Sequence, residues 1–196
     1  DKMLNSVATY GGFYIGRYET GDLSQTTPVV KRINTDLSNQ TWYTMWKKAR
    51  KLSGTSAGVQ MIWGTQWDQV MKWLIDTGTK SYSEIAKNAL SWGNYSDNGF
   101  TYYTDTSKNT VTKPEGKYSP RIIPSGAYEG TNAYNIYDLS GNVYDITLEC
   151  GYNDSRFGRG GESGISGSYY PAGYRTTNPI VYSGDGIGVR CSLFIK

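Results

Sequence analysis

The sequence predicts an α+β fold, and three observations lead to this prediction. Strand patterns occur near both ends of the chain, at 10–20, 144–150 and 188–195. Helical patterns are confined to 41–52 and 66–76, so the helices and strands are segregated rather than alternating. Long stretches without any repeat connect these elements. Helices segregated in this way pack beside a small antiparallel sheet.

The segment YGGFYIGRYET, residues 10–20, predicts the first strand. Phe13, Ile15 and Arg17 alternate with the residues between them. Such alternation, with aromatic and β-branched residues after a Gly-Gly turn, is typical of a strand.

Helical spacing of apolar residues predicts two helices. The first covers about 41–52, with Thr41 as its N-cap. The second covers about 66–76, with Thr65 as its N-cap and Gly78 after its end. Its apolar side chains share one face, which we expect to lie in the core. They are Trp67, Val70, Met71 and Leu74.

Two stretches have no regular pattern. Residues 21–40 are predicted to form a loop. Residues 77–134 are expected to form functional loops or short irregular strands, because so long an irregular stretch is unusual inside a compact domain. Within it, the spacing of Ile85 and Ala89 predicts a short third helix over 83–90. Since no linker or internal repeat divides the chain, we expect one domain over 1–196.

The last strands are the strongest strand candidates after the first. In 188–195, Val189 and Cys191 alternate with Gly188 and Arg190, which predicts a single apolar face. We expect the first and last strands to pair and to bring the two termini together.

Composition excludes several functions. The chain has no histidine. Histidine is the commonest acid–base group and transition-metal ligand, so His-based triads and His-bound iron or zinc are excluded. The net charge of +3 is too small for a nucleic-acid surface, and the basic run at 47–51 is interpreted as a solvated helix face. No segment reaches the ~18 apolar residues of a membrane helix, so we expect no membrane insertion. The start at Asp1 indicates a trimmed protein or fragment, and a missing leader therefore gives no location.

The two cysteines and one turn are further candidate sites. Cys150 and Cys191 permit either one disulfide or two free thiols. Asn142 and Asp145 are candidate calcium ligands. The alternative for Asn142 is that its side chain satisfies backbone groups in the Ser-Gly-Asn turn.

Other charged residues receive structural interpretations. Arg156 and Arg159 either contact a ligand or pin a loop to backbone carbonyls, and we favour the second. Arg190 is expected to be structural. Glu149 and Glu162 do not follow a glycosidase spacing rule. The Gly-rich segment at 158–161 lacks the Lys-Ser/Thr pair and the helix of a phosphate loop.

Five motifs in a fixed order suggest a family. They are GGFYIGRYET (11–20), TWYTMWKKARKLSG (41–54), GTQWDQVMKWL (64–74), YDLSGNVYDITLE (137–149), and RGGESG followed by GIGVRC (159–164 and 186–191). Together they resemble the sulfatase-modifying-factor domain, the formylglycine-generating-enzyme type of C-type-lectin-like fold. The resemblance implies two helices packed on small antiparallel sheets, with long irregular loops.

The resemblance also bears on activity. Aerobic formylglycine-generating enzymes bind copper through two cysteines that follow the RGG motif. The corresponding segment here, 162–171, contains no cysteine. The resemblance therefore implies a scaffold without catalytic residues, metal or cofactor. The alternative is a copper oxidase with an atypical site, in which Cys150 and Cys191 come together to supply the thiolates that copper(I) needs.

Within this fold the chain most resembles the variable proteins of diversity-generating retroelements. Their varied positions lie near the C-terminus, between residues resembling RGG and GFR. The matching segment here, 152–185, combines Tyr with small polar residues, a composition suited to adaptable binding surfaces. The predicted ligand-binding residues all lie in it. They are Tyr152, Asn153, Ser155, Phe157, Tyr169, Tyr170, Tyr174, Tyr182, Ser183 and Asp185.

The sequence thus predicts a non-enzymatic binding protein. Its expected partner is a protein or glycan on a cell, virion or host surface, and its expected place is a phage tail or a bacterial cell surface. A third interpretation is a structural module of a larger adhesin or fibre that makes no use of the Tyr-rich segment. The frame is expected to depend on five side chains: Phe13, Trp42, Trp46, Trp67 and Leu193.

Overall fold

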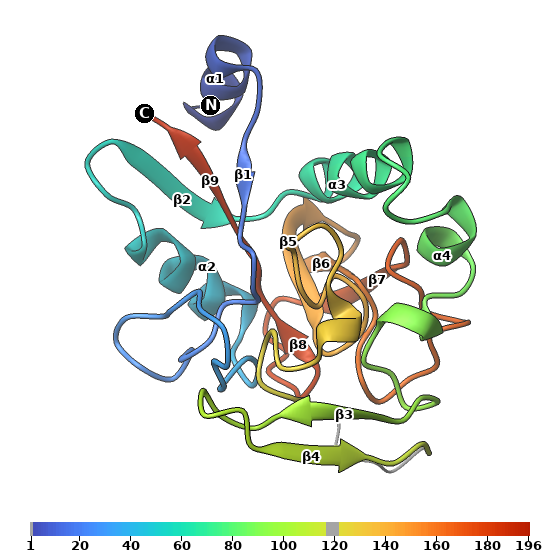
Figure 1. The fold of residues 1–196 in the computed structure, drawn as a ribbon. Helices are drawn as coiled ribbons and strands as arrows, with labels where there is room; N and C mark the ends of the chain where they lie inside the picture. The colour runs from blue at the N-terminus through green and yellow to red at the C-terminus, as the bar shows by residue number, and fades with distance from the viewer. Residues whose placement is uncertain (1, 117–121) are drawn as a thin grey trace.

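The computed structural model describes residues 2–116 and 122–196 and has mixed helices and small sheets (Figure 1). The helices are α1 (Lys2–Tyr10), α2 (Trp42–Lys51), α3 (Gly64–Asp76) and α4 (Tyr82–Ala86), with short 3-10 turns η1 (Leu90–Trp92) and η2 (Glu129–Thr131). The strands are β1 (Tyr14–Ile15), β2 (Ala57–Met61), β3 (Phe100–Tyr103), β4 (Thr110–Lys113), β5 (Tyr144–Cys150), β6 (Ser155–Arg159), β7 (Arg175–Pro179), β8 (Ile187–Gly188) and β9 (Cys191–Ile195). This composition confirms the α+β prediction.

The first sheet has the order β1-β9-β2 and joins the two ends of the chain. Tyr14 is paired with Leu193 in an antiparallel register, so the predicted pairing of the first and last strands is confirmed. The termini lie close together beside this sheet (Figure 1). The predicted extent of the first strand is wrong. Only two residues form β1, and Tyr10 ends helix α1, which the sequence analysis did not predict.

The last strand is interrupted, contrary to prediction. β8 belongs to the second sheet and β9 to the first, and Val189 and Arg190 connect them. The expected single apolar face is also wrong, because Arg190 and Ser192 are as buried as Val189 and Cys191. A strand that passes between two sheets is covered on both faces, so its polar side chains must find partners inside the protein.

The two predicted helices are present, with one corrected boundary. Thr41 caps α2 as predicted, and its Oγ1 accepts a hydrogen bond from Thr44 N at 3.3 Å. Helix α3 begins two residues earlier than predicted, with Trp63 rather than Thr65 as its N-cap residue. The cause is Gln66, whose side-chain oxygen accepts from Trp63 N at 3.0 Å and so satisfies the first turn.

The irregular regions contain short elements. The predicted helix at 83–90 is instead α4, capped by Ser81 and Glu84, followed by the separate turn η1. The hairpin β3–β4 lies within 77–134, as the prediction of short strands allowed, although 117–121 lies outside the described residues. Strand β2 was not predicted.

Two apolar clusters form the interior. One packs α3 against η1 and the segment before β5, and it includes Trp67, whose Nε1 donates to Ala172 O at 3.1 Å. The other packs α2 against β2, β5 and β9. Of the five predicted frame residues only Trp67 is fully buried, and the other four are half-buried against these clusters. Within the described ranges, no helix has the length and apolar character needed to cross a bilayer.

Candidate functional site

The second sheet carries the predicted ligand-binding segment. Its order is β7-β6-β5-β8, with β6 antiparallel to both β5 and β7. In this topology the loops that connect the strands lie at the two opposite ends of β6. The β5–β6 turn and the start of the 180–186 loop leave the sheet beside Ser155, whereas the 160–174 loop leaves it beside Arg159. The two ends are about 13 Å apart along the strand.

The turn end, residues 152–154 and 180–183, is held by backbone hydrogen bonds. Ser155 N donates to Tyr152 O at 3.1 Å, and Ile180 N donates to Asp154 O at 3.0 Å. Asn153 and Asp154 both adopt left-handed backbone conformations, which these two residue types tolerate. Tyr152 is 86% exposed and Asn153 is also exposed, so a fixed backbone presents these side chains to solvent.

The second part of the turn end contributes another tyrosine. Tyr182 is 52% exposed, and its backbone N–H donates to Pro179 O at 3.0 Å. Ser183 is exposed as well. Gly184 O accepts a hydrogen bond from Asn39 N at 3.3 Å, which ties this loop to the segment before α2. The structure therefore brings Tyr152, Asn153, Tyr182 and Ser183 to one end of the sheet.

The loop end, residues 166–174, lies at the opposite end. Tyr169 is 76% exposed, whereas Tyr170 and Tyr174 are half-buried with their rings edge to face at 4.7 Å. Asp97 anchors this loop, since it accepts from Ser166 Oγ at 2.5 Å and from Gly167 N at 3.2 Å.

A buried tyrosine supports the loop end from below. The Tyr95 hydroxyl lies 3.0 Å from both Gly160 O and Tyr170 O, and it accepts from Ser140 Oγ at 3.0 Å. Burial raises the pKa of Tyr95 above its ordinary value. Sequence reasoning missed both Tyr95 and Asp97. They lie about 70 residues before the loop, in a stretch without periodicity, and no local signal identifies them.

Three predicted site residues have other surroundings. Ser155 is buried, and its Oγ donates to Tyr152 O at 2.5 Å, so it belongs to the frame of the turn. Phe157 is half-buried beneath the Arg175 guanidinium, 4.6 Å from its ring centre. Asp185 is exposed and lines a polar depression of about 450 Å³. The other residues of this depression are Asn39, Ile122, Glu162, Ser163 and Gly186.

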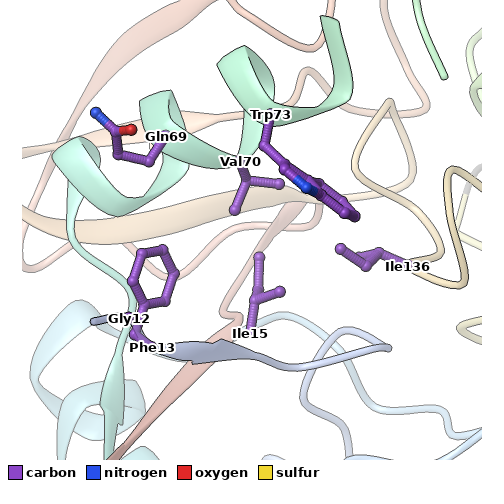
Figure 2. Close-up of a pocket in the computed structure, with 7 residues that line it drawn as sticks. All are labelled: Gly12, Phe13, Ile15, Gln69, Val70, Trp73 and Ile136. Atoms are coloured by element: carbon purple, nitrogen blue, oxygen red, sulfur yellow. The ribbon is translucent and has the colours of Figure 1, made fainter. Parts of the chain in front are cut away.

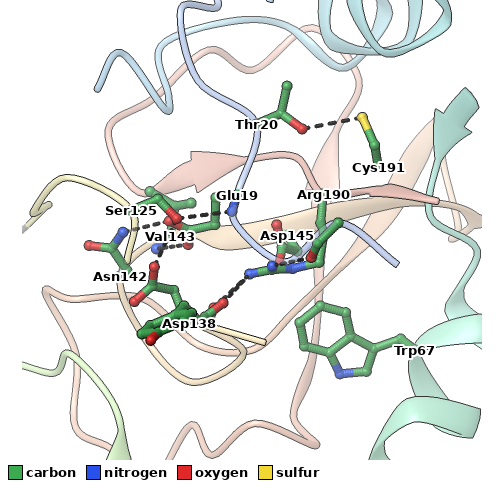
Figure 3. A network of polar contacts seen from close by, with 12 residues as sticks. Glu19, Thr20, Trp67, Ser125, Asp138, Asn142, Val143, Asp145, Arg190 and Cys191 are labelled. Atoms are coloured by element: carbon green, nitrogen blue, oxygen red, sulfur yellow. Dashed lines mark hydrogen bonds and ion pairs between the residues drawn. The ribbon is translucent and has the colours of Figure 1, made fainter. Parts of the chain in front are cut away.

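A network of buried charges surrounds Arg190 and includes Asp145 of β5 (Figure 3). Arg190 is fully buried, and its Nε donates to Asp145 Oδ2 at 2.8 Å. Its remaining donors reach Gly16 O at 2.9 Å, Tyr137 O at 2.9 Å and Asp138 O at 3.0 Å. The predicted structural role of Arg190 is confirmed, because one guanidinium joins β1, the turn before β5 and β9.

Three carboxyl groups share this network. Burial raises the pKa of Glu19, and repulsion from Asp138 and Asp145 raises it further. Burial also raises the pKa of Asp145 to about 6, although the charge of Arg190 acts in the opposite direction. Burial alone would lower the pKa of Arg190, but the charges of Asp145 and Glu19 raise it. The cluster therefore stabilises the charged form of its arginine, and Asp145 takes up a proton at a higher pH than a free carboxyl but is ionised opposite Arg190 at neutral pH.

The candidate calcium ligands are both engaged in this network. Asn142 Nδ2 donates to Glu19 Oε2 at 2.6 Å and to Ile123 O at 3.2 Å, and Asn142 Oδ1 accepts from Ile123 N at 3.0 Å. The Asn142 side chain does satisfy backbone groups, but they belong to Ile123 and not, as predicted, to the Ser-Gly-Asn turn. Asp145 pairs with Arg190 instead of facing a cation site.

The two cysteines are not paired. Cys150 is an exposed free thiol and Cys191 is a buried one. Cys191 Sγ lies 3.2 Å from Thr20 Oγ1, and burial raises the pKa of its thiol to about 11. In 2–116 and 122–196 no group of three or more Cys, Asp or Glu side chains is arranged to hold a metal ion.

Arg159 and Arg156, the two arginines predicted to pin a loop or to contact a ligand, make different contacts. Arg159 is buried, donates to Asp68 Oδ1 at 2.5 Å and reaches Gly173 O at 3.4 Å, so it pins the 160–174 loop as favoured. Arg156 donates to Ser155 O and stacks on Trp42.

An apolar depression of about 360 Å³ lies away from this segment, between β1 and α3 (Figure 2). Its side chains are apolar except for Gln69, and none of them titrates. They come from Gly12, Phe13, Ile15, Gln69, Val70, Trp73 and Ile136. It offers no acid–base or nucleophilic group.

Helices packed beside small sheets, with long loops at the ends of β6, define the class of the protein as C-type-lectin-like. No established protein family and no curated protein matches the chain. Several solved structures are similar to it over most of its length. Treponema denticola variable protein 1 is 14% identical, with a TM-score of 0.50, over 97% of this chain and 80% of that one. PvdO from Pseudomonas aeruginosa is 15% identical, with a TM-score of 0.57, over 93% and 80%. CarF is 14% identical, with a TM-score of 0.54, over 100% and 82%.

These similarities confirm the predicted fold. At 14–15% identity they show the fold alone. The neighbours include a variable protein and formylglycine-generating-enzyme-like proteins, so the chain shares its scaffold with both of the classes that the sequence resembles.

Proposed function

We propose that the protein is a non-enzymatic binding protein that contacts a protein or glycan on another cell, virion or host surface. The observation that carries the proposal is the exposure of Tyr152, Tyr169 and Tyr182 on loops whose backbones are tied down. Tyrosine supplies a large contact area for the loss of only two torsions. A loop that is already ordered avoids part of the entropy cost of binding.

The finer form of the proposal is that the exposed positions of 152–185 tolerate diversification, as in a retroelement variable protein. The exposed side chains of the two ends make few contacts within the protein, whereas the residues that anchor them are buried. Treponema denticola variable protein 1 has the same fold, which supports this form. Side chains in such positions can be exchanged at little cost in folding free energy.

The enzymatic alternative receives less support from the geometry. It requires Cys150 and Cys191 to bind one copper ion, yet one thiol is exposed and the other is buried against Thr20. A competition assay with a copper(I) chelator tests it directly. Tight, stoichiometric copper binding that is lost in Cys191→Ser would count against the binding-protein proposal.

The test of the proposal separates the two ends of β6. Wild-type protein would be applied to arrays of glycans and of bacterial and phage-host surface proteins, and ligands would be confirmed by biolayer interferometry. We expect Tyr152→Ala with Tyr182→Ala, or Tyr169→Ala, to weaken binding at least about tenfold, since buried aromatic anchors dominate interfaces. Folding should be unchanged.

The matched control is Tyr82→Ala with Tyr134→Ala, because these tyrosines are also mostly exposed, at 63% and 62%, but lie outside the segment. Equal loss of binding in the control and the test variants would contradict the proposal. So would full retention of binding in both test variants, which the structural-module interpretation expects.

A further inference from the structure

Helix α2 presents a series of aromatic rings, each with a cation against it. The Trp42 and Trp46 rings stack at 6.2 Å, and the Tyr43 and Trp46 rings at 5.7 Å, with interplanar angles of 17° and 18°. The cations are Lys47 over Tyr43 at 4.4 Å, Arg50 over Trp46 at 4.7 Å, and Arg156 of β6 over Trp42 at 4.5 Å. We call these six residues the α2 aromatic–basic face.

The rings of this face are held in place. Trp42 Nε1 donates to Thr147 O at 2.9 Å, and Trp42 and Trp46 pack against the apolar cluster beneath α2. Tyr43, in contrast, is 52% exposed, and Lys47 and Arg50 are exposed too. The face therefore combines fixed indoles with an accessible phenol and accessible cations.

The positive charge of the protein is concentrated here. The chain has 20 Lys and Arg against 17 Asp and Glu. Helix α2 holds four of the cations and no acid, so the rest of the chain, with 16 cations and 17 acids, has a net charge of −1. Lys48 and Lys51 reach the carbonyls of Gln25 and Thr26.

Helix stability does not account for this arrangement. Cations near a helix C-terminus interact favourably with its dipole, which explains Lys48, Arg50 and Lys51 in the last turn of α2. It does not explain why Arg156 reaches Trp42 from a different element, or why the exposed Tyr43 ring has Lys47 against it. Cations lying on ring faces leave their outer N–H groups available to an anion, and the exposed part of the Tyr43 ring lies beside them.

We propose that the α2 aromatic–basic face is a second binding site, and that its ligand is an acidic polysaccharide. The sugar would contact the exposed part of the Tyr43 ring, and its carboxylate or sulfate groups would pair with Lys47, Arg50 and Arg156. The helix is about 15 Å long, which matches a few sugar units and is short for a nucleic-acid footprint. The proposal is independent of the tyrosines at 152–185.

The test uses a heparin-derived hexasaccharide as probe, with titration calorimetry in 50 mM and 300 mM NaCl. We expect saturable binding to wild-type protein that weakens with salt, and no binding of neutral maltohexaose. Lys47→Gln with Arg50→Gln should weaken binding at least about tenfold through the loss of two charged partners. Tyr43→Ala should weaken it about fivefold, and Tyr43→Phe should bind like wild type because the ring remains.

The matched control is Lys87→Gln with Lys108→Gln, which removes the same charge from exposed positions elsewhere. It should bind within about twofold of wild type. The proposal is overturned if the control loses as much affinity, if a twelve-residue oligothymidine binds as tightly as the hexasaccharide, or if the hexasaccharide does not bind. Loss of array binding on replacing Tyr152 or Tyr169, with hexasaccharide binding unchanged, separates this site from the proposed function.

Discussion

Replacement of Arg190 by methionine is the most direct test of how this fold is held together. The substitution leaves an unbranched apolar side chain, shorter than that of arginine, and removes four hydrogen bonds and the cation that faces Asp145. Removing one partner of a buried ion pair typically costs about 3–5 kcal/mol, because the other charge stays buried without compensation. We therefore expect Arg190→Met to lower the free energy of unfolding by about 4 kcal/mol.

The loss of folding free energy in Arg190→Met should increase as the pH rises. Without the guanidinium, the pKa of Asp145 rises above its value of about 6 in the wild type. At pH 5 the Asp145 carboxyl of the variant is then neutral and costs little to bury. At pH 7.5 the same carboxyl is an anion in the unfolded chain, so folding must either bury the anion or bind a proton, and both cost free energy. The destabilisation should accordingly be larger at pH 7.5 than at pH 5.

Urea unfolding followed by tryptophan fluorescence measures this, since Trp67 is fully buried near the network (Figure 3). The double variant Arg190→Met with Asp145→Asn should recover part of the lost stability at pH 7.5, because it removes the uncompensated charge. A loss below about 1 kcal/mol, or one that is equal at both pH values, would refute the reasoning that a buried charge pair holds the three segments.

Three further outcomes follow from the same structure. Wild-type stability should fall as pH rises from about 4 to 6, because the raised pKa of Asp145 makes the folded state bind more protons than the unfolded state in that window; urea midpoints across this range that rise with pH would contradict this. Cys150 should react with a thiol reagent within minutes, while Cys191 should react only on unfolding, since it is buried and burial raises its pKa to about 11; mass spectrometry of the labelled peptides distinguishes them. Tyr95→Phe should lower the free energy of unfolding by about 2 kcal/mol, because it leaves buried groups without a partner. Amide hydrogen exchange should become faster in 160–174, and an unchanged exchange rate would show that Tyr95 does not anchor that loop.

The parts of the fold that the sequence predicts are those with a repeated pattern. Helices α2 and α3 and strand β5 have clear periodicity, and the pairing of the two terminal strands followed from their position. Helix α1 has nine residues and buries only Met3 and Ser6, so it is a short element at the edge of the core that was not distinguished in the sequence. Strand β2 is a five-residue segment, AGVQM, too short for its pattern to be separated from a loop.

The candidate site is predictable in composition but not in geometry. The sequence identifies 152–185 as rich in tyrosine, yet nothing local indicates that β6 separates Tyr152 from Tyr169 by the length of a strand. The burial of Ser155 depends on a hydrogen bond within the turn. The anchors Tyr95 and Asp97 act across about 70 residues, through contacts that exist only once the chain has folded.

The distribution of polar contacts explains how one chain can combine a fixed frame with exchangeable surface residues. The motif residues Asn142, Asp145 and Arg190 are buried and bonded to three different segments, so replacing any one of them leaves buried polar groups unpaired. Tyr152 is mostly exposed and Tyr182 about half exposed, and most of the bonds that fix their loops come from backbone groups that every residue type except proline possesses. Change at the surface therefore costs far less folding free energy than change beneath it, and this difference is the physical condition that a diversified binding surface requires.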